Sequence, residues 1–110
     1  MDSILNDIKK LLGMSSDYTA FDTDIIIHIN SVFMILNQLG VGPEGGYKIT
    51  DASNTWSEFT NDNLMIESVK SYIYLKVRIM FDPPQNSAHM NAMQSQIQEL
   101  EWRLNVASED

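Results

Sequence analysis

DTDIIIHINSVFMILNQLGVGP, residues 22–43, is the stretch that decides the fold of this 110-residue chain. At about 100° per residue, its regularly spaced apolar residues share one arc of roughly 140°, which predicts a helix with one face on a core. Those residues are Ile25, Ile26, Ile29, Val32, Phe33, Leu36 and Leu39. Asp22 or Thr23 is expected to cap the start of this helix, and Gly40 suits the position just past its end.

Four large apolar residues lie outside the main apolar stripes of their predicted helices, namely Ile27, Met34, Ile35 and Trp102. Two interpretations are open. Either the rest of the monomer covers these side chains, or some of them pack against a neighbouring subunit. Burial of a large apolar side chain contributes about 1.5–3 kcal/mol, so two or three such residues in each contact are enough to help close an assembly.

The remaining sequence predicts an all-α fold, a small bundle of four to five helices that forms a single domain over residues 1–110. Besides the quoted stretch, we expect helices over about 3–12, 63–81 and 87–106, with a short helical piece over 55–59. Residues 40–54 form a long glycine-rich loop, in which the alternation of 47–50 indicates a short extended segment as an alternative to irregular structure. In a small domain, a loop of this length is more often functional than idle.

The last predicted helix carries a narrow apolar seam at the 3-4-3-4 spacing that is typical of a coiled coil. The seam consists of Met90, Met93, Ile97, Leu100 and Leu104. Trp102 lies off this seam among polar residues, and Arg103 follows Glu99 at the i, i+4 spacing of a helical ion pair.

The composition excludes several classes of protein. The chain has a net charge of −8 and no cysteine, so a disulfide or a thiolate metal site is excluded. Clustered basic residues, which proteins use to grip nucleic acid, are absent apart from the adjacent pair Lys9 and Lys10. No signal peptide or apolar span of membrane length is present, so we expect a soluble protein, made in the cytoplasm and without a membrane partner.

No residue pattern in the chain predicts catalysis, a metal site or a cofactor. The two histidines, His28 and His89, lack further ligands at a metal-binding spacing. The acidic residues of 22–24 are better explained by the preference for acids at the start of a helix. The glycines of 40–46 do not form a phosphate loop, since no lysine follows at the required place. We therefore expect a protein that is not an enzyme.

Four segments, in this order, together resemble the head–tail connector (adaptor) proteins of long-tailed bacteriophages. They are DIIIHINSVFMILNQLGVGP at 24–43, WSEF at 56–59, VKSYIYLKVRIMFDPP at 69–84 and QIQELEWRLNVA at 96–107. The positions that match the family's recurring pattern are Gly40, Gly42, Pro43, Trp56, Asp82, Pro83, Pro84, Trp102 and Arg103.

The resemblance implies a small α-helical adaptor, without enzymatic activity or cofactor, at the head–tail junction of the virion. Such proteins are made in the bacterial host cytoplasm and form a ring, usually of twelve copies, beneath the portal protein. The ring extends the DNA channel, lets DNA pass without specific binding, and docks the stopper or tail-completion protein. The candidate interface residues, from the off-stripe apolar positions, the long loop and the last helix, are Ile27, Met34, Ile35, Gly42, Pro43, Tyr47, Trp102 and Arg103.

A second function remains open from the sequence. The heptad-like seam of the last helix is also typical of a small acidic regulatory module that pairs with a partner helix. Such a module predicts a discrete dimer or heterodimer and no ring.

Overall fold

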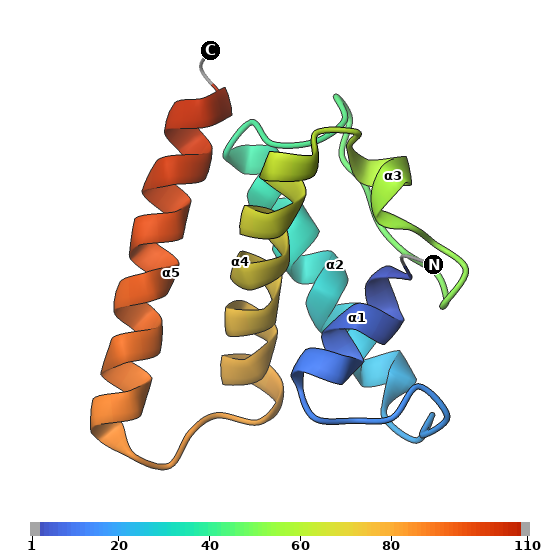
Figure 1. Cartoon of the computed structure of the whole chain (residues 1–110), viewed down its shortest axis with the longest axis vertical. Coiled ribbons are helices and arrows are strands. Elements are labelled where there is room, and N and C mark those ends of the chain that lie inside the picture. Colours follow the sequence, from blue (N-terminus) through green and yellow to red (C-terminus); the bar gives the residue numbers. More distant parts are fainter. Residues whose placement is uncertain (1–2, 109–110) are drawn as a thin grey trace.

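The computed structural model describes residues 3–108 and consists of five helices (Figure 1). Their bounds are α1 Ile4–Leu11, α2 Asp22–Gln38, α3 Trp56–Phe59, α4 Asn63–Phe81 and α5 Ser87–Ser108. The prediction of an all-α fold with a long loop is therefore confirmed. The predicted helices agree with these bounds to within two residues at each end.

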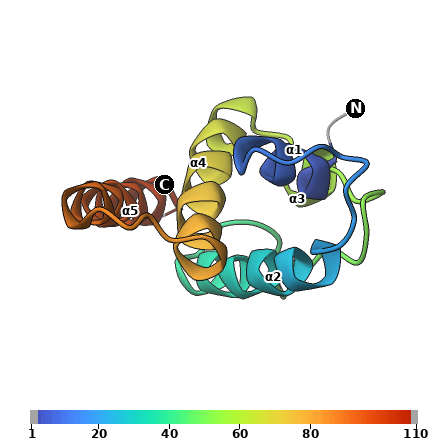
Figure 2. The same ribbon diagram turned by 90° about the horizontal axis from the view of Figure 1, so that it is seen from below.

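Helix α4 is the central element, since it packs against α1, α2 and α5. Figure 2 shows α1 and α2 as two layers on one side of α4, with α5 along its opposite side. The core between these helices is apolar, as the periodicity predicts. Its α2 and α4 members are Ile25, Ile29, Val32, Phe33, Leu36, Val69, Tyr72, Ile73, Leu75 and Val77.

Helix α2 ends as the sequence predicts but begins differently. At its C-terminus the Gly40 N–H donates to Asn37 O at 3.0 Å and the Val41 N–H donates to Leu36 O at 2.9 Å, which is the Schellman arrangement. Gly40 has the positive φ of +85° that this arrangement requires. At the N-terminus, the expected cap by Asp22 or Thr23 is wrong. Helix α2 starts at Asp22 itself, and no side chain caps it.

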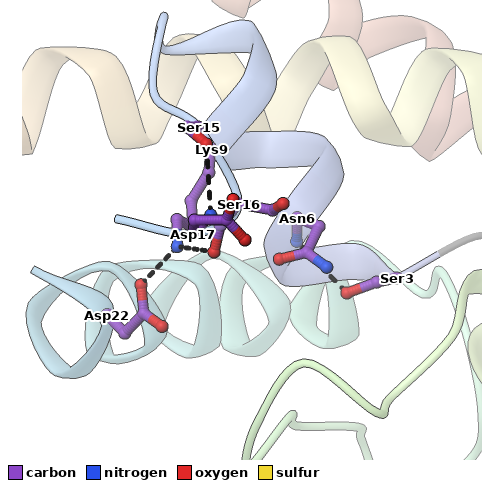
Figure 3. A network of polar contacts seen from close by, with 7 residues as sticks. All are labelled: Ser3, Asn6, Lys9, Ser15, Ser16, Asp17 and Asp22. Atoms are coloured by element: carbon purple, nitrogen blue, oxygen red, sulfur yellow. Dashed lines mark hydrogen bonds and ion pairs between the residues drawn. The ribbon is translucent and has the colours of Figure 1, made fainter. Parts of the chain in front are cut away.

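Asp22 is instead the partner of a buried lysine. The Nζ atom of Lys9, whose side chain is 1% exposed, lies 2.8 Å from Oδ1 of Asp22. The same Nζ donates to the carbonyl oxygen of Ser16 at 3.1 Å (Figure 3). A buried charge is tolerated when it is both paired and hydrogen-bonded. Lys9 therefore joins α1 to the start of α2 and to the connection between them.

The long loop, residues 39–55, is anchored by one side chain of α2. Asn30 Oδ1 accepts from the N–H of Ile49 at 2.8 Å, and Asn30 Nδ2 donates to the carbonyl of Ile49 at 3.0 Å. The Ile49 side chain is buried in the core. The extended segment expected over 47–50 does not form a strand, because the amide side chain takes the place of a neighbouring strand.

We expect Asn30→Ala to lower the free energy of unfolding by about 2–3 kcal/mol, because both backbone polar groups of the buried Ile49 lose their partner. Asn37→Ala, at an exposed position of the same helix, is the matched control and should change it by less than about 0.5 kcal/mol. Urea unfolding followed by circular dichroism measures both. Equal losses in the two variants would show that Asn30 does not anchor the loop.

The short helix α3 is fastened to α1. The indole Nε1 of Trp56 donates to Oδ2 of Asp7 at 2.7 Å, and Nζ of Lys70 lies 5.5 Å from the centre of the indole ring. Ser3 and Thr55 form an antiparallel bridge beside this contact. These contacts explain why Trp56, although on a four-residue helix, is 2% exposed.

None of the helices in the described part of the chain has both the length and the apolar character that a bilayer crossing requires.

Candidate functional site

Three of the four off-stripe apolar residues are exposed on the monomer. Ile27 is 57% exposed, Met34 66% and Trp102 68%. Ile35 differs, since it is partly buried against the core and lines a hollow between α2, α4 and α5. Within the monomer, α2 and α5 thus each present large apolar side chains to solvent. Such side chains are candidates for contacts between proteins when they gather on one face.

A second hollow, of about 440 Å³, lies between the outer side of α2 and the long loop. It is lined by Asn30, Phe33, Met34, Asn37, Gly45, Gly46, Tyr47 and Lys48. We call it the α2–loop pocket. It contains two of the predicted interface residues, Met34 and Tyr47.

The wall of the α2–loop pocket is held by aromatic packing and one hydrogen bond. The ring centres of Phe33 and Tyr47 lie 5.1 Å apart in an edge-to-face arrangement, and Phe59 packs against both. The hydroxyl of Tyr47 donates to Oε1 of Glu58 at 2.8 Å. Partial burial and the Glu58 carboxylate raise the pKa of Tyr47, so its hydroxyl stays a donor at neutral pH. The Tyr47 side chain is therefore held in the pocket wall by ring packing and by its hydrogen bond to Glu58.

Gly42 and Pro43 shape the same loop. Gly42 has a φ of +100°, and a Cβ atom placed there would collide with the ring of Phe59. The carbonyl of Pro43 accepts from the N–H of Gly46 at 3.0 Å and closes the turn beside the pocket. The structure thus gives both predicted interface positions a role in the loop conformation.

Helix α5 attaches to α4 along its apolar seam. Met93, Ile97 and Leu104 are buried, and the hydroxyl of Tyr72 in α4 donates to Oε2 of Glu101 at 2.7 Å. Burial is the main reason why the pKa of the Tyr72 hydroxyl is raised, and the hydrogen bond to Glu101 raises this pKa further. At the C-terminal end, Ser108 Oγ donates to the carbonyl of Leu39 at 2.9 Å and fastens α5 to the end of α2. The seam is thereby occupied within the monomer.

Trp102 and Arg103 lie away from the seam. Arg103 Nη2 forms an ion pair with Oε2 of Glu99 at 2.6 Å, and both side chains are about 60% exposed. An exposed pair of this kind contributes little to stability. The outer side of α5 is consequently free to contact another protein (Figure 2).

Over residues 3–108, no three His, Asp or Glu side chains are arranged to hold a metal ion. His28 lies instead beside Phe81, with ring centres 6.4 Å apart.

An exposed aromatic group at the start of α2 was missed by the sequence analysis. Phe21, which is 41% exposed, packs edge-to-face on Tyr18 and on Phe81. The available signal was the position of Phe21 and Phe81 at the ends of two predicted helices. Those two ends meet only in the folded chain.

Comparison with known proteins identifies the family of the chain. The sequence model of a family described as phage connector protein matches residues 4–110, which is nearly the whole chain. No curated protein and no solved structure matches the chain significantly. This five-helix chain belongs to the phage connector protein family.

Proposed function

We propose that this connector acts as a structural adaptor that forms a ring beneath the portal protein of a long-tailed phage. In this role it extends the DNA channel and docks the stopper or tail-completion protein. The observation that carries the proposal is the exposure of Ile27 and Met34 on α2 together with that of Trp102 on α5. One folded monomer thus offers two apolar surfaces on different helices.

Two separate surfaces suit a closed ring. Each subunit of a ring contacts two neighbours through two different patches, and contacts of this head-to-tail kind close when the rotation between subunits divides a full turn. A dodecamer is the number of copies that we propose for the virion.

The charge of the chain supports passage of DNA rather than its binding. The net charge is −8, and the ion pairs of the described residues engage four of the seven basic side chains. Binding to DNA strengthens with each phosphate that a free basic residue neutralises. We therefore propose that DNA moves through the ring without a specific site.

The binding-module alternative loses its main support in the structure. It requires the seam of α5 to be available to a partner helix, whereas Met93, Ile97 and Leu104 are buried within the monomer. A module of this kind would have to open α5 away from α4 before it could pair.

We expect Met34→Glu to impair assembly on the portal ring while it leaves the monomer folded, because Met34 is 66% exposed and contributes little to the core. Leu64→Glu, at a position that is 85% exposed at the start of α4, is the control for the added charge. Thermal unfolding and co-sedimentation with the portal ring measure the two effects. Two outcomes would show that Met34 is not part of an assembly contact. Either the Met34→Glu variant unfolds, or it co-sediments with the portal ring to the same extent as the wild type.

A further inference from the structure

We propose that the indole ring of Trp102 in one copy of the chain fills the α2–loop pocket of the next copy. The inference rests on the proposed ring and identifies the contact between its subunits. It commits to a second copy of this chain as the occupant of the pocket.

Trp102 has the position of a docking residue. The residues that bind α5 to α4 are Met93, Ile97 and Leu104, and at 100° per residue Trp102 lies about 140–160° around the helix from Ile97 and Leu104. The helical geometry therefore places Trp102 on the side of α5 opposite α4. Figure 2 shows that α5 has α4 on one side and none of the other helices on the opposite side. An exposed tryptophan is costly to leave in water and is among the residues that most often dominate protein interfaces.

The α2–loop pocket has the shape and chemistry to receive an indole ring. Its volume is about 440 Å³, and its lining includes Met34, at an exposed position, and the half-buried Tyr47, which packs on the buried Phe33. The glycines at 45 and 46 leave backbone without side chains on one wall. The amide oxygen of Asn37, an exposed residue with no other side-chain role in the described contacts, can accept from the indole N–H.

The indole that fills this pocket has to come from another copy. The residues that line the pocket belong to α2 and the loop, and none belongs to α5. Trp102 of the same chain stays 68% exposed in the folded monomer. A projection on one helix and a pocket on another give a head-to-tail contact, which each added copy repeats.

Charges of opposite sign flank both partners of the proposed contact. Beside Trp102 lie Glu99 and Arg103, which pair with each other in the monomer. Beside the pocket, the exposed side chains of Glu44 and Lys48 stand on the same loop. Arg103 can therefore meet Glu44 while Glu99 meets Lys48, so that two strongly acidic subunits attract each other locally.

Tryptophan fluorescence tests the burial of Trp102. The chain has only two tryptophans, and Trp56 is already 2% exposed in the monomer. Assembly on the portal ring of the same phage should therefore shift the emission to shorter wavelength and reduce quenching by acrylamide, both through Trp102. Trp102→Phe should show neither change. An unchanged spectrum in a sample that has assembled would overturn the proposal.

Assembly of substituted chains tests the energy of the contact. Trp102→Ala should raise the protein concentration for half-maximal assembly by about 30-fold, as expected for a dominant interface residue. Leu64→Ala, at another exposed apolar position, is the matched control and should leave it within about twofold. Circular dichroism verifies that both variants are folded. Equal effects of the two substitutions would contradict the contact.

Disulfide capture tests the identity of the occupant. Because the chain contains no cysteine, Gln98→Cys beside Trp102 and Asn37→Cys in the pocket can be made in separate preparations. Mixed on the portal ring and oxidised, they should give a dimer of one copy of each. Gln98→Cys alone should give none. A dimer from Gln98→Cys alone, or capture of the pocket cysteine by a cysteine variant of the portal, would show a different occupant and overturn the proposal.

The proposed function and this inference fail in different ways. If the wild-type chain forms no ring on the portal, the proposed function fails before the contact is tested. If the ring forms and Trp102→Ala joins it as readily as the wild type, the ring stands and the Trp102 contact is wrong.

Discussion

Gly42→Ala is expected to lower the free energy of unfolding by about 2–5 kcal/mol. The φ of +100° at this position costs a residue with a Cβ atom about 1–2 kcal/mol. The new Cβ would also lie 2.8 Å from Cζ of Phe59, and closer still to its Cε1. Phe59 is buried and packs on Phe33, so its ring has no free space to enter, and overpacking of this kind adds about 1–3 kcal/mol.

Gly45→Ala separates these two causes. Gly45 lies in the same loop with a φ of +94°, but a Cβ atom there would meet no other atom within 4 Å. Its loss of stability should therefore be the backbone cost alone, about 1–2 kcal/mol. Urea unfolding of Gly42→Ala and Gly45→Ala measures the difference between their free energies of unfolding. Equal losses would show that the contact of Gly42 with Phe59 does not constrain the loop.

Asp22→Ala is expected to destabilise the protein by about 3 kcal/mol, because it leaves the buried ammonium group of Lys9 without its counter-charge. The loss of a fully buried partner costs more, but the Asp22 side chain is 26% exposed, so water can replace part of the interaction. Asp24→Ala, at an exposed position in the same first turn of α2, is the control. It should cost less than about 1 kcal/mol through the helix dipole.

A further pair of variants distinguishes a lost ion pair from a poorly filled site. Lys9→Met keeps the apolar stem of the side chain and removes its charge, and Lys9→Met with Asp22→Asn removes the charge of both partners. Replacement of a buried ion pair by groups of similar volume is often close to neutral. The double variant should therefore recover most of the stability lost in Asp22→Ala, as measured by thermal unfolding. Failure to recover would mean that Asp22 contributes through something other than Lys9.

The helices could be predicted from the sequence because their evidence is local. The apolar spacing of 25–39 predicts helix α2, and Asp82-Pro83-Pro84 predicts the end of α4 because proline cannot continue a helix. Neither prediction needs knowledge of the fold, and both agree with the structure. The position of Trp102 off the seam of α5 was also visible in the sequence, but only the structure shows that the monomer leaves this side chain exposed. The position of Gly40 just past α2 followed from the rules for helix ends.

The features that the sequence did not reveal depend on residues far apart in the chain. The sequence shows Lys9 only as the neighbour of Lys10, and its burial arises only when Asp22 is brought beside it. Asn30 acquires its partner only in the folded chain, where the loop brings the backbone of Ile49 beside it. Local pattern contains no information on such partners. For the same reason, the α2–loop pocket could not be anticipated, although Met34 and Tyr47 were expected at an interface.

Electron microscopy of the purified protein mixed with the portal ring of the same phage tests the central claim most directly. If the chain is the adaptor that we propose, averaged images will show an added layer of density that is coaxial with the portal and has its rotational symmetry. The Met34→Glu variant in the same experiment should give a layer of lower occupancy. Bare portal rings at saturating concentrations of the folded wild-type chain would contradict the proposed function.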